Sequence, residues 1–158
     1  VAAAASETPF QRHVEPVIVQ SFILYSTILA LKMLAMSALT SGSRVARGVF
    51  ANIEDAKHAN GIVKFDDPVI ERIRRAHRND LENIPVFWLL GALYLTTAPY
   101  TFVARLLFRA YTVGRVLHTL VYAVWPLPQP TRGIAFGMTL MIKLYMATHV
   151  MLHYVKYF

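Results

Sequence analysis

Cysteine is absent from this chain of 158 residues. Its absence excludes a disulfide framework, a thiolate metal site and a cysteine nucleophile. If the protein performs sulfur chemistry, the sulfur therefore comes from a ligand. The sequence also lacks a phosphate-binding loop, a dinucleotide-binding fingerprint and a zinc-protease motif, so no local signal points to a nucleotide-dependent or zinc-dependent enzyme.

Acidic residues are few, with 9 Asp and Glu against 16 Lys and Arg, and the formal net charge is +7. Hydrophobic residues make up 56% of the chain, more than a soluble domain of this length normally carries. A nucleic-acid-binding surface is not expected in so apolar a chain, and we predict a membrane protein without a nucleic-acid partner. Residues 1–12 have no basic n-region, which argues against a cleaved signal peptide.

Four apolar segments dominate the chain and predict four membrane-spanning helices. We expect these helices at about residues 14–39, 68–97, 101–124 and 131–157. Each has at least about 20 residues, enough to cross about 30 Å of hydrocarbon. Asp67 is placed to cap the second helix, with Pro68 at its first position. The polar stretch of about residues 40–66 is expected to fold over one mouth of the bundle. The predicted fold class is an all-α integral membrane protein, a four-transmembrane-helix bundle with residues 1–158 as a single membrane domain.

The twelve residues 71–82 carry seven charges and run directly into apolar sequence. Exposure of such a block to lipid would cost roughly 2.5–3.5 kcal/mol per ionised residue at mid-bilayer. At about 100° per residue, six of the polar side chains fall within one arc of about 120°: Glu71, Arg72, Arg75, Arg78, Asn79 and Glu82. The arc suits a zwitterionic ligand with carboxylates at both ends. The alternative is a solvated helix at the membrane surface with internal ion pairs.

A second polar stripe lies on the third predicted helix. Its members are spaced by four, three and four residues and share one helical face: Tyr111, Arg115, His118 and Tyr122. The stripe could line a site, or it could form a structural hydrogen-bond network between helices. Arg105 and Arg109 point away from it and are expected to reach the far membrane interface by snorkelling.

Four further polar residues lie in the apolar segments. Lys32 and Lys143 are candidates for buried cations. The alternative for Lys32 is that it neutralises Glu71 or Glu82, whereas Lys143 has no obvious partner and is expected to be structural or to face another subunit. His149 and His153 form an i,i+4 pair, but no carboxylate accompanies them. We therefore predict no metal site.

Basic residues predict the orientation in the membrane. They gather in the stretch of residues 40–66, at the start of the second helix, and at Arg132 at the start of the fourth. By the positive-inside rule, this side faces the cytosol and both termini lie on the opposite side.

Three motifs follow one another along the chain: residues 50–55 (FANIED), 71–84 (ERIRRAHRNDLENI) and 115–119 (RVLHT). Together they resemble a known family, the membrane-associated proteins in eicosanoid and glutathione metabolism (MAPEG). Residues 126–136 (PLPQPTRGIAF) are similar to the glutathione-transferase branch of that family. The resemblance implies a homotrimer with one glutathione site at each subunit interface. It also implies a multi-pass protein of the endoplasmic reticulum membrane and the outer mitochondrial membrane, with its active site facing the cytosol.

The same resemblance implies roles for individual residues. Those that would meet the carboxylates of glutathione are Arg44, Arg74, Arg75 and Arg78. Those that would hold its polar backbone and amino group are His77, Asn79 and Glu82. Those that would line the site from the third helix are Arg115, His118 and Tyr122. Arg132 would be the catalytic residue, placed near the thiol.

The implied activity is that of a membrane glutathione S-transferase and peroxidase, with glutathione as co-substrate. Its thiolate would attack lipophilic electrophiles from the bilayer and lipid hydroperoxides. One alternative is a glutathione-dependent prostaglandin E synthase, which Arg78 resembles, although Gly133 and Phe136 replace the Ser and Tyr of that pattern. The other is a non-enzymatic lipid-binding helper, against which the retained Arg75 and Arg132 argue.

Overall fold

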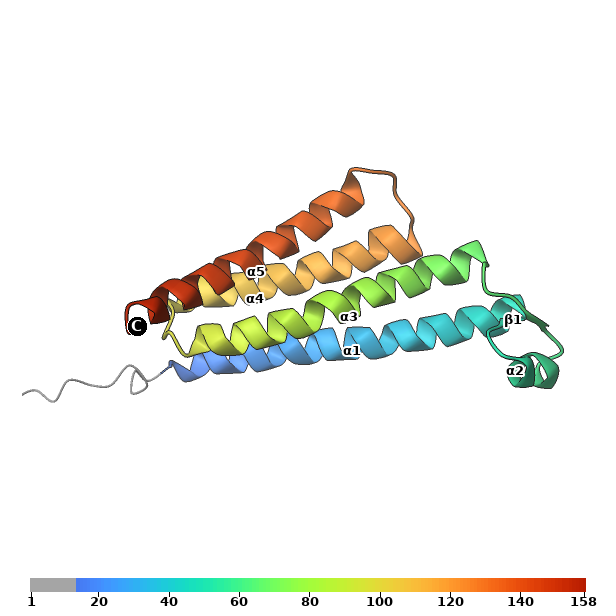
Figure 1. Cartoon of the computed structure of the whole chain (residues 1–158), viewed down its shortest axis with the longest axis horizontal. Coiled ribbons are helices and arrows are strands. Elements are labelled where there is room, and N and C mark those ends of the chain that lie inside the picture. Colours follow the sequence, from blue (N-terminus) through green and yellow to red (C-terminus); the bar gives the residue numbers. More distant parts are fainter. Residues whose placement is uncertain (1–13) are drawn as a thin grey trace, which may run out of the picture.

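The computed structural model describes residues 14–158, which fold into four long helices and a small lobe (Figure 1). The long helices are α1 (Pro16–Arg47), α3 (Pro68–Leu95), α4 (Thr101–Thr119) and α5 (Thr131–Val155). The lobe consists of β1 (Val49–Phe50), α2 (Ile53–His58) and β2 (Ile62–Val63), and a π-helical turn, η2 (Leu120–Val124), extends α4. The predicted all-helical class is confirmed. Residues 1–12, where no cleaved signal peptide is expected, lie outside the described residues.

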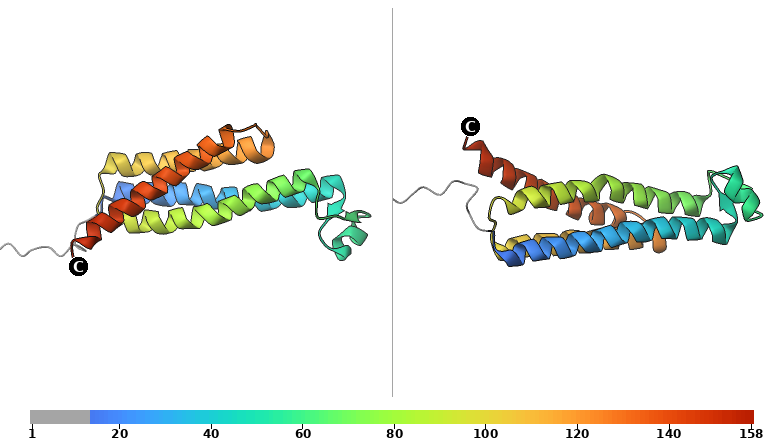
Figure 2. Two further views of the ribbon diagram at one scale, coloured as in Figure 1. Left: turned by 45° about the horizontal axis from the view of Figure 1, so that its top comes forward. Right: turned by 90° about the horizontal axis from the view of Figure 1, so that it is seen from below.

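The long helices lie alongside one another, and each contacts two or more of the others. α1 packs against α3 and α4, and α5 packs across the same two helices from another side (Figure 2). The lobe and the corner between α4 and α5 lie toward one end of the molecule (Figure 1). The turn between α3 and α4 and the C-terminus lie at the other end. We call these the lobe end and the C-terminal end.

Within the described residues, two helices, α1 and α5, are long and apolar enough to cross a membrane by length and composition. α3 and α4 have comparable lengths of 28 and 19 residues but carry the charged block and the polar stripe. Their polar side chains are divided between the interior and the outer face of the molecule, and this division determines which of them a ligand can reach.

The first helix is longer than predicted. α1 ends at Arg47 rather than near residue 39, because Gly48 adopts a left-handed conformation with φ of 60° and its N–H caps the carbonyls of Arg44 and Val45. The Thr40 hydroxyl donates to the Met36 carbonyl at 2.9 Å, so the hydroxyl-rich turn stays helical. Ser and Gly disfavour a helix interior by only about 0.5–1 kcal/mol each, too little to end a long helix. The polar connection therefore begins at Gly48, not residue 40.

Local capping fixes the start of α3 as expected. Asp67 Oδ1 accepts hydrogen bonds from the Val69 and Ile70 N–H groups, both at 3.1 Å, and Pro68 occupies the first turn. The Arg47 guanidinium pairs with Asp67 Oδ2 at 2.9 Å and thereby joins the end of α1 to the start of α3. Burial acts to raise the pKa of Asp67, but the hydrogen bonds from Arg47 and the two N–H groups outweigh it and leave the pKa below its ordinary value.

The apolar core lies between the long helices on the C-terminal side of the charged block. The rings of Phe87 and Tyr111 stack with centroids 3.9 Å apart and an interplanar angle of 3°. Gly114 lets α4 and α5 approach closely, since a Cβ there would lie 2.5 Å from Met138 and 2.7 Å from Thr139. This close approach sets the position of the start of α5 against the end of α4.

Candidate functional site

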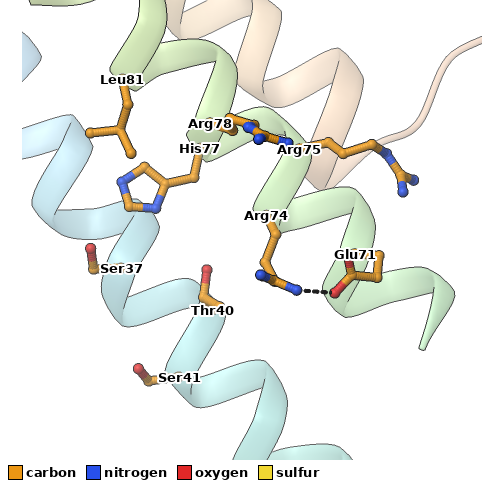
Figure 3. A pocket seen from close by; sticks show the side chains of 9 residues that line it. All are labelled: Ser37, Thr40, Ser41, Glu71, Arg74, Arg75, His77, Arg78 and Leu81. Atoms are coloured by element: carbon orange, nitrogen blue, oxygen red, sulfur yellow. Dashed lines mark hydrogen bonds and ion pairs between the residues drawn. The ribbon is translucent and has the colours of Figure 1, made fainter. Parts of the chain in front are cut away.

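An open cavity of about 580 Å³ lies between α1 and α3, toward the lobe end (Figure 3). Six of the nine lining residues come from α3 and three hydroxyl residues come from α1. The lining residues are Ser37, Thr40, Ser41, Glu71, Arg74, Arg75, His77, Arg78 and Leu81. With three arginines and one glutamate, the cavity is positively charged and suits an anionic ligand.

Four of the predicted glutathione ligands line this cavity: Arg74, Arg75, His77 and Arg78. His77 points toward α1, whereas Arg75 and Arg78 extend from the other side of α3 (Figure 3). Arg74 Nη1 donates to Glu71 Oε1 at 2.5 Å, so Glu71 partly neutralises it. The Arg78–Glu82 pair is loose, at 3.7 Å between exposed side chains.

Arg75 is the freest of these cations. It is exposed, and it makes no hydrogen bond or ion pair with any residue of the described part of the chain. An exposed guanidinium with all its donors available is well suited to a carboxylate, which it can bind through two parallel hydrogen bonds.

Behind the cavity, a network of charges is buried between α1, α3 and α4. Asp80, which is fully buried, accepts from Lys32 Nζ through Oδ2 and from Arg115 Nη2 through Oδ1, the latter at 2.5 Å. The same Arg115 Nη2 donates to Asn79 Oδ1 at 2.9 Å, and the Thr119 hydroxyl lies 3.5 Å from Asp80. Arg115 is 0% exposed and therefore acts inside one chain rather than on its surface.

The partner expected for Lys32 was wrong. Lys32 pairs with Asp80, not with Glu71 or Glu82. At about 100° per residue, Asp80 lies on the side of the helix opposite Glu71. α1 packs against that side, since Met36 of α1 and Ile73 belong to one buried apolar cluster. Sequence reasoning missed Asp80 because its two partners are distant in the chain and no local pattern connects them.

Two members of the predicted α4 stripe serve the structure. Arg115 holds Asp80, and the Tyr111 hydroxyl donates to the Asn83 carbonyl at 2.9 Å. Lys143, for which the sequence suggested no partner, donates to Asn83 Oδ1 at 2.5 Å. Tyr111 and Arg115 thus form hydrogen bonds between helices, as the structural alternative for the stripe expects.

The rest of the stripe leads to the start of α5. The rings of His118 and Tyr122 lie 5.5 Å apart at 29°, and the Arg132 guanidinium carbon lies 5.0 Å from the centroid of the Tyr122 ring. Nε of Arg132 is buried and has no hydrogen-bond partner among residues 14–158. Arg132 is thus held by a cation–π contact in the first turn of α5, where the helix dipole favours an anion.

In a single chain, the predicted site residues therefore form two groups. The cavity group is Arg74, Arg75, His77 and Arg78. The group that extends from the interior of the molecule to the start of α5 is Asn79, Arg115, His118, Tyr122 and Arg132. Arg44 lies in the last turn of α1 with Nη1 buried and unpartnered among residues 14–158, and Glu82 is exposed beside Arg78. The hydroxyls of Ser37, Thr40 and Ser41 were not predicted, because nothing in their sequence distinguishes them from helix-surface residues.

Within residues 14–158, no group of three or more His, Asp and Glu side chains could hold a metal ion. His149 instead packs edge-on against Tyr94, with ring centroids 5.0 Å apart.

Comparison with known proteins agrees with the motifs. The profile of the MAPEG family matches residues 22–152. Microsomal glutathione S-transferase 1 of Mus musculus is 41% identical over 136 residues, which cover 82% of this chain and 86% of the relative. The protein of the same name from Homo sapiens is 42% identical over 133 residues, covering 80% and 84%. Prostaglandin E synthase of Bos taurus is 39% identical over 120 residues, covering 75% and 78%. Identities of this size over three quarters or more of the chain, together with the family profile, show that the chain belongs to the MAPEG family.

Proposed function

We propose that this protein is a membrane glutathione transferase, which binds glutathione as co-substrate and activates its thiolate for attack on lipophilic electrophiles and lipid hydroperoxides. The observation that carries the proposal is the arginine-rich cavity between α1 and α3 in a chain of the MAPEG family. Glutathione has two carboxylates, an amino group and a thiol. The cavity offers arginines for the carboxylates and Glu71 for the amino group. Its volume is typical of small-ligand sites.

The carboxylates are assigned to the exposed guanidinium groups. Arg75 has no partner among residues 14–158, Arg78 is only loosely paired with Glu82, and both lie on the accessible face of α3. Arg74, which lines the same cavity, and Arg44, in the last turn of α1, are assigned supporting contacts with the carboxylates. His77 and the hydroxyls of α1 lie across the cavity and supply hydrogen bonds to the peptide part of the ligand.

The polar face of α3 also motivates a homotrimer. Arg74, Arg75, Arg78 and Glu82 are exposed in a single chain, and lipid contact would cost roughly 2.5–3.5 kcal/mol for each ionised group at mid-bilayer. A second copy covers this face without that penalty. We therefore assign the chain to a four-transmembrane-helix bundle that assembles as a cyclic homotrimer with its sites at the subunit contacts. The start of α5 lies toward the same end as the cavity, so Arg132 of one copy can face the glutathione of the next.

The chemistry needs no protein nucleophile, and the chain has no cysteine to offer. A thiol of this type has an ordinary pKa of about 8.5, and a nearby guanidinium lowers it by stabilising the thiolate. The thiol proton leaves to solvent, the sulfur forms a bond to the electrophilic carbon, and the leaving group departs with its electron pair. With a hydroperoxide, two glutathione molecules are oxidised to the disulfide while the peroxide is reduced to alcohol and water. Arg132 is the catalytic candidate because its buried Nε has no partner among residues 14–158.

The membrane placement follows from the distribution of basic residues. The lobe end carries the basic residues of the first connection, the start of α3 and Arg132, and is assigned to the cytosol. We assign the protein to the endoplasmic reticulum membrane and the outer mitochondrial membrane, the locations that the resemblance of its motifs to the family implies. The lipophilic substrate then enters from the bilayer and glutathione from the cytosol.

One alternative is also favoured by an observation. The prostaglandin E synthase of Bos taurus is 39% identical, only slightly below the transferases. Arg78 agrees with that branch, but Gly133 and Phe136 depart from it. A lipid-binding helper without catalysis is the third possibility within the family.

The deciding experiment is conjugation of 1-chloro-2,4-dinitrobenzene by the purified protein with glutathione, beside isomerisation of a prostaglandin endoperoxide. The proposal expects conjugation. Arg75→Ala is expected to weaken glutathione binding by about 1.5–3 kcal/mol in calorimetry, the value of a charge-assisted hydrogen bond. Arg105→Ala, which removes an arginine far from the cavity, is the matched control and keeps the wild-type affinity. Isomerisation without conjugation would support the synthase, and neither activity would support the helper.

A further inference from the structure

Another cavity, of about 200 Å³, lies on the outer face of α4 near the C-terminal end. It is lined by Phe102, Arg105, Leu106 and Arg109, all exposed side chains of one helical face. The face lies at the end of α4 opposite Arg132 and shares no lining residue with the glutathione cavity. The proposed reaction leaves it unused.

The two arginines have no anionic partner in the part of the chain that the structure describes. No ion pair among residues 14–158 involves Arg105 or Arg109. They are four residues apart on a helix, where like charges face each other and repel unless an anion lies between them. Glu15, at the neighbouring end of α1, accepts instead from the Thr101 hydroxyl at 2.7 Å.

Arg109 is also held in place. Its Nε donates to the Tyr25 hydroxyl of α1 at 3.0 Å, which restrains the side chain beside α1 and leaves the two terminal nitrogens free. A free arginine near a helix end can extend to the interface, but a restrained one has less reach. At 1.5 Å per residue, Arg105 and Arg109 lie about 6 and 12 Å along the axis from Thr101. Both guanidiniums are therefore at the depth of headgroups and the upper acyl chains when α4 spans the membrane.

The surroundings are those of a lipid rather than of a soluble anion. Phe102 and Leu106 are 67% and 51% exposed and flank the arginines with an apolar surface. A soluble inorganic anion has no apolar part that could contact Phe102 and Leu106. A phospholipid supplies a phosphate for the arginines and an acyl chain for the apolar residues.

We propose that this cavity binds an anionic phospholipid from the leaflet at the C-terminal end, with its phosphate between Arg105 and Arg109. A headgroup with net negative charge is preferred because a choline ammonium would add a third cation beside the two guanidiniums. The inference rests on the transmembrane placement of α4 and is independent of the glutathione reaction.

Native mass spectrometry of the full-length, delipidated protein in detergent tests the site. The protein is titrated with phosphatidylglycerol and, separately, with phosphatidylcholine of identical acyl chains. The variants are Arg105→Gln/Arg109→Gln and, as a control with the same loss of charge, Lys57→Gln/Lys64→Gln in and beside the lobe. Conjugation of 1-chloro-2,4-dinitrobenzene is measured for each.

The expected result is binding of phosphatidylglycerol at least about tenfold tighter than phosphatidylcholine, a difference of about 1.4 kcal/mol. The arginine variant loses this preference, the lysine variant keeps it, and both retain the conjugation rate of the wild type. Equal binding of the two lipids, an unchanged preference in the arginine variant, or displacement of the lipid by inorganic phosphate would each overturn the proposal. A change of oligomeric state in the arginine variant, with no lipid bound to the wild type, would assign the arginines to a protein contact instead. If neither the wild type nor the variants conjugate the aryl halide, the transferase proposal fails, whereas the lipid measurement stands by itself.

Discussion

Replacement of Asp80 by Asn tests how much the buried charge network contributes to stability. The substitution keeps the size of the side chain but removes its charge, and so leaves the cations of Lys32 and Arg115 facing each other without a counter-ion. The Arg115 side chain is 0% exposed and the Lys32 side chain is 11% exposed, so water cannot fully solvate either positive charge. Removal of one partner from a buried ion pair destabilises a protein by about 3–5 kcal/mol. For a chain of this size, the melting temperature falls by about 2–4 °C per kcal/mol, a total of about 6–20 °C.

The assay is thermal unfolding of the purified protein in detergent. Asp66→Asn is the matched control, since the Asp66 side chain is 85% exposed and lies 3.8 Å from Lys64. Exposed pairs of this kind contribute about 0–1 kcal/mol. The double variant Lys32→Met/Asp80→Asn removes one of the two uncompensated cations and should recover part of the lost stability. The reasoning is refuted if Asp80→Asn lowers the melting temperature no more than Asp66→Asn does.

Three further predictions concern Arg132, the oligomeric state and the cap at the start of α3. Arg132→Ala should lower turnover by about tenfold to a hundredfold and reduce the ultraviolet thiolate absorbance of bound glutathione, with a smaller change in affinity; full turnover with full absorbance would make Arg132 an interfacial anchor only. Native mass spectrometry in detergent should show trimers, and monomers that still turn over would rule out sites at subunit contacts. The pKa of Asp67 lies below its ordinary value of 3.8, so its contribution to stability is complete above that value and is lost as the pH falls through the lower folded pKa. Melting temperatures measured from pH 6 to pH 3 should therefore fall less steeply for Asp67→Asn than for the wild type, and parallel curves would contradict this assignment.

Features that depend on neighbouring residues could be predicted from the sequence. The start of α3 was predicted because its cap, Asp67, and its first residue, Pro68, are adjacent and act through local hydrogen bonds. The break between α4 and α5 was predicted between residues 124 and 131, where prolines at positions 126, 128 and 130 cannot continue a helix. The family was identified because its motifs are continuous stretches, and the comparisons confirm it.

Features that depend on distant residues could not be predicted. Asp80 looked like one charge among seven, and only the packing of α1 and α4 against α3 shows that it is buried with Lys32 and Arg115. The length of α1 was underestimated because the hydroxyl of Thr40 bonds to its own helix, which polarity alone does not reveal. Which of the arginines on α3 are free depends on which carboxylates pair with them, and a helical wheel does not specify this.

The pairing of Asp80 also has a consequence for how the chain enters the bilayer. A charged side chain at the centre of a single inserting helix costs about 2.5–3.5 kcal/mol, and Asp80 lies within α3, which is not among the helices apolar enough to cross a membrane unaided. In the proposed membrane bundle, α1 precedes α3 in the chain and is apolar enough to cross a membrane, so Lys32 would enter the bilayer before Asp80. Arg115 completes the pairing only when α4 follows. On this proposal, insertion of α3 is coupled to α1 and α4 through Asp80, and a substitution that removes Lys32 from α1 is expected to impair the insertion of α3.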